Sequence, residues 1–353
     1  MGTNKILCPC VLNRTVDGKQ STLLLHVDDI KVLSQIPGEA KNLHTYLQEK
    51  FGKVTLNEGL RQNYLGVTFD YSVKGKVSVT MSGYESDLVN DWKEIKIDCL
   101  SARDFNAPAA TPAANNIFDK GDSEMLEDRD SAIFHSYVMR VAYLSKRVKP
   151  EMCVGVSYLS TQVTKPNVDD MRKLDRAVRY VRDHSGEGIT LFAEGEGKIV
   201  LVKGHIDASF GCHEDGKSHT GVCVTLGNGP VFVRSVKQKI VTKSSTEAEL
   251  VALSDEAGLM FHIEDFVNAQ GYSCQVMIGQ DNQSTIAMIS SDKTESMRTL
   301  HIKVRYFWLR EKLKLKELWS MCLLVTCWRI YLPNLCKVIC FEILFVISVL
   351  VVC

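Results

Sequence analysis

The sequence lacks the features that mark several common classes of protein. Its 42 Lys and Arg residues balance 42 Asp and Glu residues, so no overall basic field points to a nucleic-acid partner, and any such surface must be local. Twelve cysteines are present, but they form no C-x-x-C pair, and no signal peptide opens the sequence. We therefore expect free thiols in a reducing compartment, cytoplasmic or nuclear.

A long uninterrupted apolar run is also missing. The last 32 residues, "CLLVTCWRIYLPNLCKVICFEILFVISVLVVC", are apolar but contain Arg329, Lys337 and Glu342. The clean run after Glu342 has 11 residues, whereas a membrane-spanning helix needs about 20. Extending the run back to Val338 would bury a carboxylate. We expect no membrane anchoring by this tail, although a C-terminally membrane-anchored protein is kept as an alternative.

What the sequence does contain is ordinary for a globular protein. Its 353 residues are 45% apolar and 24% charged, enough for about two domains with a buried core. Near the start, "STLLLHVDDIKVLS" predicts a strand, a tight turn and a strand. Residues 39–52 have helical spacing and end in a glycine, and "NYLGVTFDYSVKGKVSVTMS" predicts a hairpin that turns at Lys74-Gly75.

The middle of the chain changes character twice. Residues 99–130 are irregular, with clustered Pro, Ala, Asn and acidic residues, which predicts a linker or loop. Three helices are expected next, in "HSYVMRVAYLSKRV", "EMCVGVSYLSTQV" and "VDDMRKLDRAVRYVRDH". From residue 186 the pattern predicts three strands in an antiparallel meander, a long helix, a fourth strand and a last helix, which is a mixed α/β layout.

Three acidic residues occupy related places in this last layout. Asp207 lies on the first strand, Glu249 in the first turns of the long helix, and Asp281 at the end of the fourth strand. If the first and fourth strands are neighbours, these carboxylates converge, and crowded like charges favour binding of a cation. Oxygen ligands suit Mg²⁺, and two such ions can support phosphodiester hydrolysis.

Structural roles for the same acids stay open at this point. An acid at a strand end is more often a solvated turn residue. Glu247 fits a helix capping box with Ser244, and Glu249 has the same spacing from Thr246.

A family resemblance bears on this choice. The stretch "VKGHIDASFGCHEDGKSHTGVCVTLGNGPVFVRSVKQKIVTKSSTEAELVAL", with "DN" after the fourth strand, resembles the ribonuclease H domain of copia-class retrotransposon Pol polyproteins over about residues 200–312. The resemblance implies catalytic and metal-binding roles for Asp207, Glu249 and Asp281, and favours Glu249 over Glu247. It also implies hydrolysis of the RNA strand in an RNA–DNA hybrid, with Mg²⁺, or Mn²⁺ in its place, as the cofactor.

The front of the chain resembles the reverse transcriptase of the same polyprotein. "LLLHVDDI" is similar to its catalytic turn, with His26 where tyrosine is usual, and implies that Asp28 and Asp29 are a remnant polymerase pair. "NYLGVTF" and "YLSKRVKPEMCVGVSYLSTQVTKP" are similar to its palm, thumb and connection segments, with Arg140 at a usual glycine position. Because 27 residues precede Asp28 and contain no third metal-binding aspartate, we expect no polymerase activity.

The resemblance ends before the C-terminus. Lys303 stands where the family usually has Asp, and after Leu318 the family's "ADILTKPL" segment, which holds a fourth acid, is absent. The segment "WRIYLPNLCK" is compatible with codons that encode Ala-Asp-Ile-Phe-Thr-Lys-Pro-Leu-Gln in another frame. The tail is thus interpreted as an out-of-frame translation.

These observations give one interpretation of the whole chain. We expect a truncated reverse transcriptase palm remnant (1–98), thumb and connection helices with a linker (99–185), a ribonuclease H-like mixed sheet with flanking helices (186–318) and a frame-shifted tail (319–353). Its partner would be an RNA–DNA hybrid or other nucleic acid, with no small-molecule cofactor. The expected nucleic-acid-binding residues are Lys237, Lys239, Lys243 and His301, of which the lysines would meet backbone phosphates. Since the fourth acid is lost, a non-catalytic nucleic-acid-binding relic is the main alternative.

Overall fold

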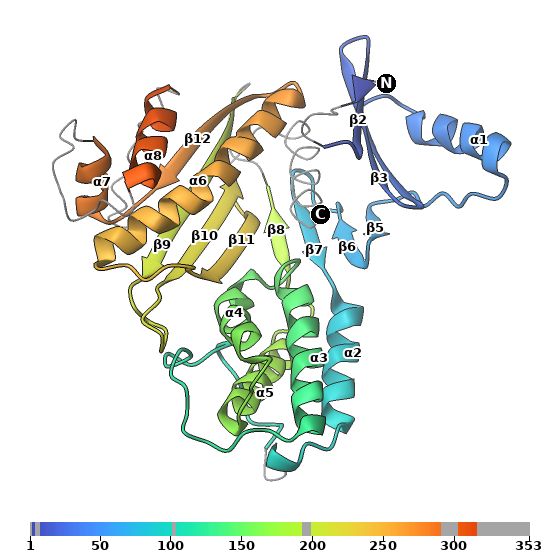
Figure 1. The fold of residues 1–353 in the computed structure, drawn as a ribbon. Helices are drawn as coiled ribbons and strands as arrows, with labels where there is room; N and C mark the ends of the chain where they lie inside the picture. The colour runs from blue at the N-terminus through green and yellow to red at the C-terminus, as the bar shows by residue number, and fades with distance from the viewer. Residues whose placement is uncertain (1, 4–7, 101–103, 193–198, 291–302, 316–353) are drawn as a thin grey trace.

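The computed structural model describes residues 2–3, 8–100, 104–192, 199–290 and 303–315. Within these residues the protein is a mixed α/β structure with three four-stranded sheets (Figure 1). One sheet carries a single helix, the second adjoins a layer of helices, and the third is crossed by the longest helix of the described part.

The first sheet is built from consecutive antiparallel strands. They are β1 (Gly2–Thr3), β2 (Val11–Val16), β3 (Lys19–His26) and β4 (Asp29–Ser34). Asp17 and Gly18 between β2 and β3 both have positive φ, at 50° and 75°, as a two-residue hairpin turn with the twist of its strands requires. The predicted strand–turn–strand around Asp28 is confirmed, with His26 paired to Asp29.

Helix α1 (Glu39–Phe51) follows this sheet and ends at Gly52, as the sequence predicts. Its apolar residues are not buried, however: Tyr46 is 55% exposed and Phe51 78% exposed. Leu43 and Leu47 are half-buried. The helical spacing therefore identified the element correctly, although its apolar side chains are only partly covered by the described residues.

The second sheet joins distant parts of the chain. It has the order β5 (Arg61–Tyr64), β6 (Val67–Asp70), β7 (Val77–Thr80) and β8 (Ile189–Leu191). The hairpin expected around Lys74-Gly75 is the β6–β7 pair, whereas β5 and β8 were not predicted. Because β8 pairs with β7, the segment near residue 190 completes a sheet that began near residue 61.

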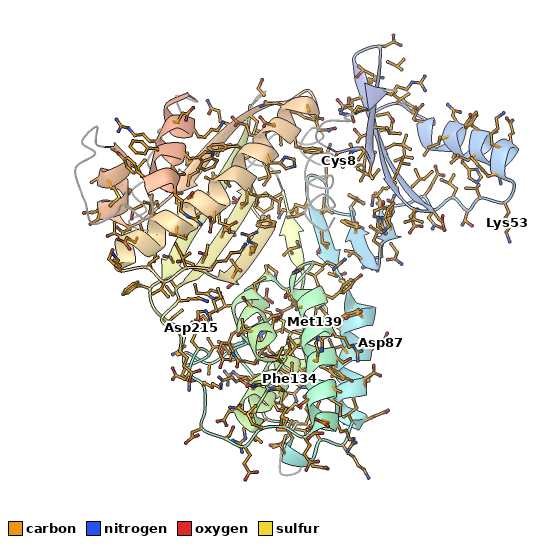
Figure 2. All side chains as sticks on the ribbon, viewed as in Figure 1. Cys8, Lys53, Asp87, Phe134, Met139 and Asp215 are labelled. Carbon is orange, nitrogen blue, oxygen red and sulfur yellow. The ribbon has the colours of Figure 1, made fainter. Side chains whose placement is uncertain are left out.

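Four helices pack into one layer below this sheet (Figures 1 and 2). They are α2 (Ser82–Glu94), α3 (Asp128–Ser145), α4 (Cys153–Gln162) and α5 (Val168–Asp183). The last three were predicted and α2 was not. Trp92, Phe134 and Leu174 are fully buried between them, and the Trp92 indole donates a hydrogen bond to Asp175 over 3.0 Å.

The segment before α3 is irregular, as predicted, but it is not a free linker. Ala109 and Ile117 are buried. Arg176 and Arg179 of α5 donate hydrogen bonds to its backbone carbonyls, at Thr111 and Ala107. Arginine side chains of α5 thus donate to backbone carbonyls that are not paired in a helix or a sheet.

The third sheet has the strand order β11-β10-β9-β12. Its strands are β9 (Ile199–Ser209), β10 (His219–Leu226), β11 (Pro230–Lys237) and β12 (Ser273–Gly279). The first three form the predicted antiparallel meander, and β12 pairs with β9 in parallel. Helices α6 (Ser245–Ala269), α7 (Gln283–Ser290) and α8 (Lys303–Leu315) lie with this sheet, and α7 was not predicted.

Helix α6 approaches β9 very closely. At Gly204 of β9, an added Cβ would lie 2.4 Å from the Met260 sulfur of α6, so any side chain there would displace the helix or Met260. Ala248, Ala252 and Ala257 of α6 are completely buried. Gly204 on β9 and the buried alanines on α6 therefore permit close packing of the helix on the sheet.

Two further expectations bear on the whole chain. None of the seven described cysteines forms a disulfide; they are Cys8, Cys10, Cys99, Cys153, Cys212, Cys223 and Cys274. Across the described ranges, none of the helices has both the length and the apolar character needed to cross a membrane. His301 and the tail interpreted as frame-shifted lie outside the described residues.

Candidate metal centre

The pairing of β9 and β12 determines where the candidate acids lie. The parallel pairing ends where Gly279 lies opposite His205, while β9 continues to Ser209. The chain leaves β12 at Gln280, beside the part of β9 that carries Asp207. Asp281 therefore lies next to Asp207, because β12 ends at Gly279 whereas β9 extends to Ser209.

The three acids predicted from the sequence come together at this point. Asp207, Glu249 and Asp281 each offer a carboxylate oxygen, and these oxygens all lie within 4.8 Å of one another. Asp207 and Asp281 are exposed, whereas Glu249 is 5% exposed. Glu249 therefore forms the buried side of the cluster, and Asp207 and Asp281 form its solvent-exposed side.

Glu249 is fixed in place by two hydrogen bonds. Its Oε1 accepts from the Ala208 backbone N–H over 3.2 Å, and its Oε2 accepts from Nε2 of Gln280 over 3.2 Å. Burial, and then the neighbouring Asp207 carboxylate, raise the pKa of Glu249 to about 7. The two donors thus fix the orientation of the carboxylate, while burial and Asp207 disfavour its ionised form. A bound cation would stabilise that ionised form.

Glu247 and Glu249 have separate places in the structure. Ser244 is the N-cap of α6, and its Oγ accepts from the Glu247 N–H over 3.3 Å. The Glu247 carboxylate turns back to accept from the Lys243 N–H over 2.7 Å. Glu247 therefore satisfies free backbone donors at the start of the helix, and Glu249 is the residue that points toward Asp207.

Gln280 was not identified from the sequence, although it is the side chain that links the acids. Besides donating to Glu249, its Oε1 accepts from the Asn282 N–H over 2.9 Å. Asn282 in turn accepts from the Thr285 N–H over 3.0 Å at the start of α7. The loop that carries Asp281 is therefore held on both sides. A lone glutamine at a strand end has no spacing signal that could have revealed this.

The residues present fit a divalent cation with oxygen ligands. Three carboxylates within 4.8 Å of one another, one of them desolvated, repel one another unless positive charge is added. Mg²⁺ and Mn²⁺ favour such oxygen donors, whereas Zn²⁺ sites more often use Cys and His. The donor set is therefore one that suits Mg²⁺ or Mn²⁺ better than Zn²⁺.

The expected phosphate-binding lysines fall into two groups. Lys239 and Lys243 are exposed on the segment between β11 and α6. Lys237 instead pairs with Asp215, with 2.9 Å between its Nζ and Oδ2 of Asp215. Lys239 and Lys243 are thus the better placed of the three to meet a polyanion.

The second predicted acidic pair lies elsewhere. Asp28 and Asp29 are exposed at the β3–β4 turn of the first sheet, outside the sheet that carries β9 (Figure 1). Val27 before them is 91% exposed and has φ of 49°, an uncommon conformation for a β-branched residue. Among the described residues, no third Asp, Glu, His or Cys joins this pair.

No family model matches the chain. Curated relatives do. The "Retrovirus-related Pol polyprotein from transposon TNT 1-94" of Nicotiana tabacum is 26% identical over 313 residues, which are 86% of this chain and 22% of the relative. The "Retrovirus-related Pol polyprotein from transposon RE1" of Arabidopsis thaliana is 24% identical over 295 residues, 83% of this chain and 19% of the relative. The chain thus spans about a fifth of the length of these polyproteins.

A shorter relative matches part of the chain. The protein named "Secreted RxLR effector protein 161" of Plasmopara viticola is 33% identical over 121 residues, which are 34% of this chain and 83% of the relative. This identity and coverage show that the two chains belong to one family over that stretch.

Proposed function

Because the chain is homologous to retrovirus-related Pol polyproteins of copia-type transposons over about 85% of its length, we propose that residues 186–318 are a ribonuclease H-like nuclease domain. The observation that carries this proposal is the convergence of Asp207, Glu249 and Asp281 within 4.8 Å at the end of a mixed sheet. The substrate would be the RNA strand of an RNA–DNA hybrid.

The proposed mechanism assigns a task to each acid. Asp207, Glu249 and Asp281 would hold Mg²⁺, which supplies activation of a water and stabilisation of the leaving oxygen. Gln280 and the Ala208 N–H orient the Glu249 carboxylate before anything binds. Asp207 and Asp281, being exposed, present the open side of the cluster to a phosphodiester.

Lys239 and Lys243 supply the complementary charge. Both precede α6 and are exposed, so their ammonium groups are free to meet backbone phosphates without displacing a core residue. Such contacts are independent of base sequence and weaken steeply with salt. Hybrid binding is therefore expected to be salt-sensitive even if cleavage is slow.

Cleavage is expected to be weak. The sequence has Lys303 where the resembled family usually has Asp, and its family-like pattern ends before the segment that carries a fourth acid. Three carboxylates suffice to hold one ion but hold a second one less firmly, and a two-ion site stabilises both the attacking and the leaving oxygen. The alternative function is a nucleic-acid-binding protein that has lost catalysis.

The test compares cleavage and binding of a labelled RNA–DNA hybrid by the full chain in millimolar Mg²⁺. Asp207→Asn should abolish whatever cleavage is present, whereas Asp87→Asn, at an exposed carboxylate on α2, should leave it unchanged. If the full chain binds the hybrid but Asp207→Asn and the native protein cleave equally little, the non-catalytic alternative holds. If cleavage persists in Asp207→Asn, the proposed site is wrong.

A further inference from the structure

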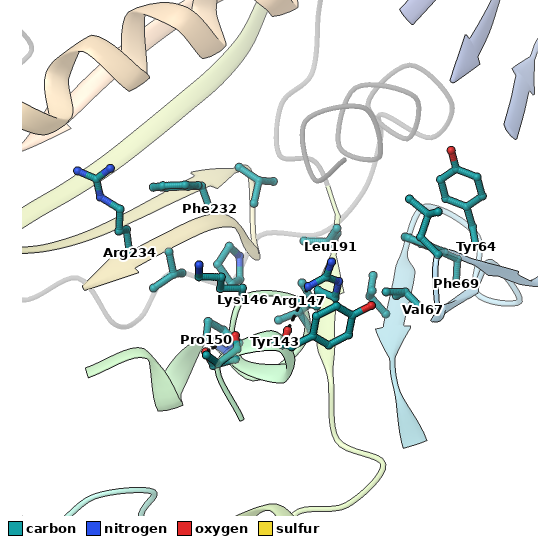
Figure 3. A pocket seen from close by; sticks show the side chains of 18 of the residues that line it. Tyr64, Val67, Phe69, Tyr143, Lys146, Arg147, Pro150, Leu191, Phe232 and Arg234 are labelled. Atoms are coloured by element: carbon teal, nitrogen blue, oxygen red, sulfur yellow. Dashed lines mark hydrogen bonds between the residues drawn. The ribbon is translucent and has the colours of Figure 1, made fainter. Parts of the chain in front are cut away.

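A hollow of about 850 Å³ lies between the second sheet, the end of α3 and the edge strand β11, with His26 of β3 also in its lining (Figure 3). Its walls are largely apolar and carry four aromatic side chains, those of Tyr64, Phe69, Tyr143 and Phe232. The volume falls in the range that pockets for small organic ligands occupy. None of the three acids of the candidate metal centre lines it.

The charged residues that line the hollow are all positive. Lys146, Arg147 and Arg234 line the hollow, and none of the described lining residues is acidic, although the chain as a whole has no net charge. Arg234 forms an ion pair with Glu256 of α6, so its charge is already compensated. Lys146 is exposed, and Arg147 makes no ion pair with a carboxylate among the described residues. Two positive charges are therefore available to a ligand.

Arg147 is held ready in one orientation. Its guanidinium carbon lies 3.5 Å from the ring centroid of Tyr143, and its Nη1 donates to the Tyr143 carbonyl over 3.3 Å. Figure 3 shows the two side chains together, between Phe232 and Arg234 on one side and Val67 and Phe69 on the other. Burial lowers the pKa of Arg147. A partly desolvated cation without a carboxylate favours the arrival of an anion.

We propose that this hollow binds a nucleoside phosphate, with its phosphate on Lys146 and Arg147 and its base against Phe232. A fixed guanidinium and a flexible ammonium suit a phosphate group. Aromatic side chains accept any base by stacking. The same chemistry belongs to a free nucleotide and to the terminal nucleotide of a single strand.

Calorimetric titration of the full chain at low salt tests the proposal with three probes: dAMP, adenosine and deoxyribose 5-phosphate. dAMP should bind most tightly, because only it offers both the base and the phosphate. Lys146→Glu should weaken dAMP binding by about tenfold or more, since it replaces an attractive charge with a repulsive one. Lys93→Glu makes the same charge change at an exposed position on α2 and should leave dAMP binding unchanged.

A second variant separates the base from the phosphate. Phe232→Leu should weaken dAMP binding but leave deoxyribose 5-phosphate unaffected. The proposal is overturned if no probe binds, if adenosine binds as tightly as dAMP, or if Lys146→Glu binds dAMP as the native chain does. Asp207→Asn should bind dAMP normally, so failure of the metal centre and failure of this site are distinguishable.

The source of the nucleotide follows from one further titration. A short 5′-phosphorylated oligodeoxynucleotide that binds more tightly than dAMP, and loses that advantage in Lys146→Glu, identifies a strand end as the ligand. Equal affinity of the two probes identifies a free nucleotide.

Discussion

At the level of single residues, Gln280 is the side chain on which the geometry of the acids depends most. It donates to Glu249 and also fixes the backbone beside Asp281. Gln280→Leu keeps the approximate volume but removes both hydrogen bonds. We expect metal affinity to fall by about 10- to 100-fold, as for other residues that orient metal ligands. Mn²⁺ titration followed by electron paramagnetic resonance measures this.

Gln275→Leu is the matched control for this prediction, because Gln275 is an exposed residue of β12, the strand that Gln280 follows. It should bind Mn²⁺ as the native protein does. Equal Mn²⁺ affinities for the native chain and Gln280→Leu would show that Gln280 does not orient the metal ligands.

The raised pKa of Glu249 predicts how metal binding depends on pH. Its ordinary value is 4.5, and the folded-state value is about 7. The folded state therefore binds this proton more tightly than the unfolded state, and the metal-free protein should lose stability as pH rises from 4.5 to 7. Protons compete with a cation for the same oxygens, so Mg²⁺ should bind better above that window than within it.

Thermal unfolding with and without millimolar Mg²⁺ checks this expectation. The increase in Tm caused by Mg²⁺ should be larger at about pH 8 than at about pH 5.5, because a ligand stabilises the folded state according to its affinity. In Glu249→Gln the increase should be small at both values. An equal increase at the two pH values in the native protein would contradict the assignment of Glu249.

At the level of elements, the contact between β9 and α6 positions Asp207 against Glu249. Gly204→Ala would place a methyl group against Met260, and overpacking of this kind costs about 1–3 kcal/mol of the free energy of unfolding. Gly221→Ala on the neighbouring strand β10 is the control, because an added Cβ there meets nothing within 4 Å. Chemical denaturation should show loss of stability in the first variant alone.

The sequence predicted those elements whose pattern is local. The strands of the third sheet and α6 follow from periodicity and turn residues. The convergence of the acids required the assumption that β9 and β12 are neighbours, and the choice of Glu249 over Glu247 rested on the family resemblance. Strand β8 was missed because three residues are too few to show a period, and it forms only by pairing with β7. Gln280 was missed because Glu249, the acid to which it donates, lies 31 residues away in the sequence.

At the level of the whole molecule, a buried ion pair ties the helical layer together. Lys149, 1% exposed, donates to the carbonyl of His184 at the end of α5, and its Nζ lies 3.7 Å from Oε1 of Glu85 on α2. Glu85 also accepts from the Gly186 N–H over 2.7 Å, just before β8. Residues far apart in the chain thus meet at one buried charge pair.

Removing one partner should be costly. Lys149→Met leaves the Glu85 carboxylate buried without its cation, which destabilises proteins by about 3–5 kcal/mol. Glu85→Leu combined with Lys149→Met should recover part of this loss, because no unpaired charge then remains. Urea denaturation of both variants measures their free energies of unfolding. If the double variant is no more stable than Lys149→Met, the unpaired charge of Glu85 is not the cause of the loss of stability.

The central claim is that Asp207, Glu249 and Asp281 form a divalent metal site, and anomalous X-ray scattering from crystals of the protein soaked in Mn²⁺ tests it most directly. We predict an anomalous peak between the three carboxylates, with oxygens at about 2.0–2.3 Å. Loss of that peak in Asp207→Asn crystals would assign it to this cluster. Well-ordered carboxylates with no peak between them in millimolar Mn²⁺ would contradict the account.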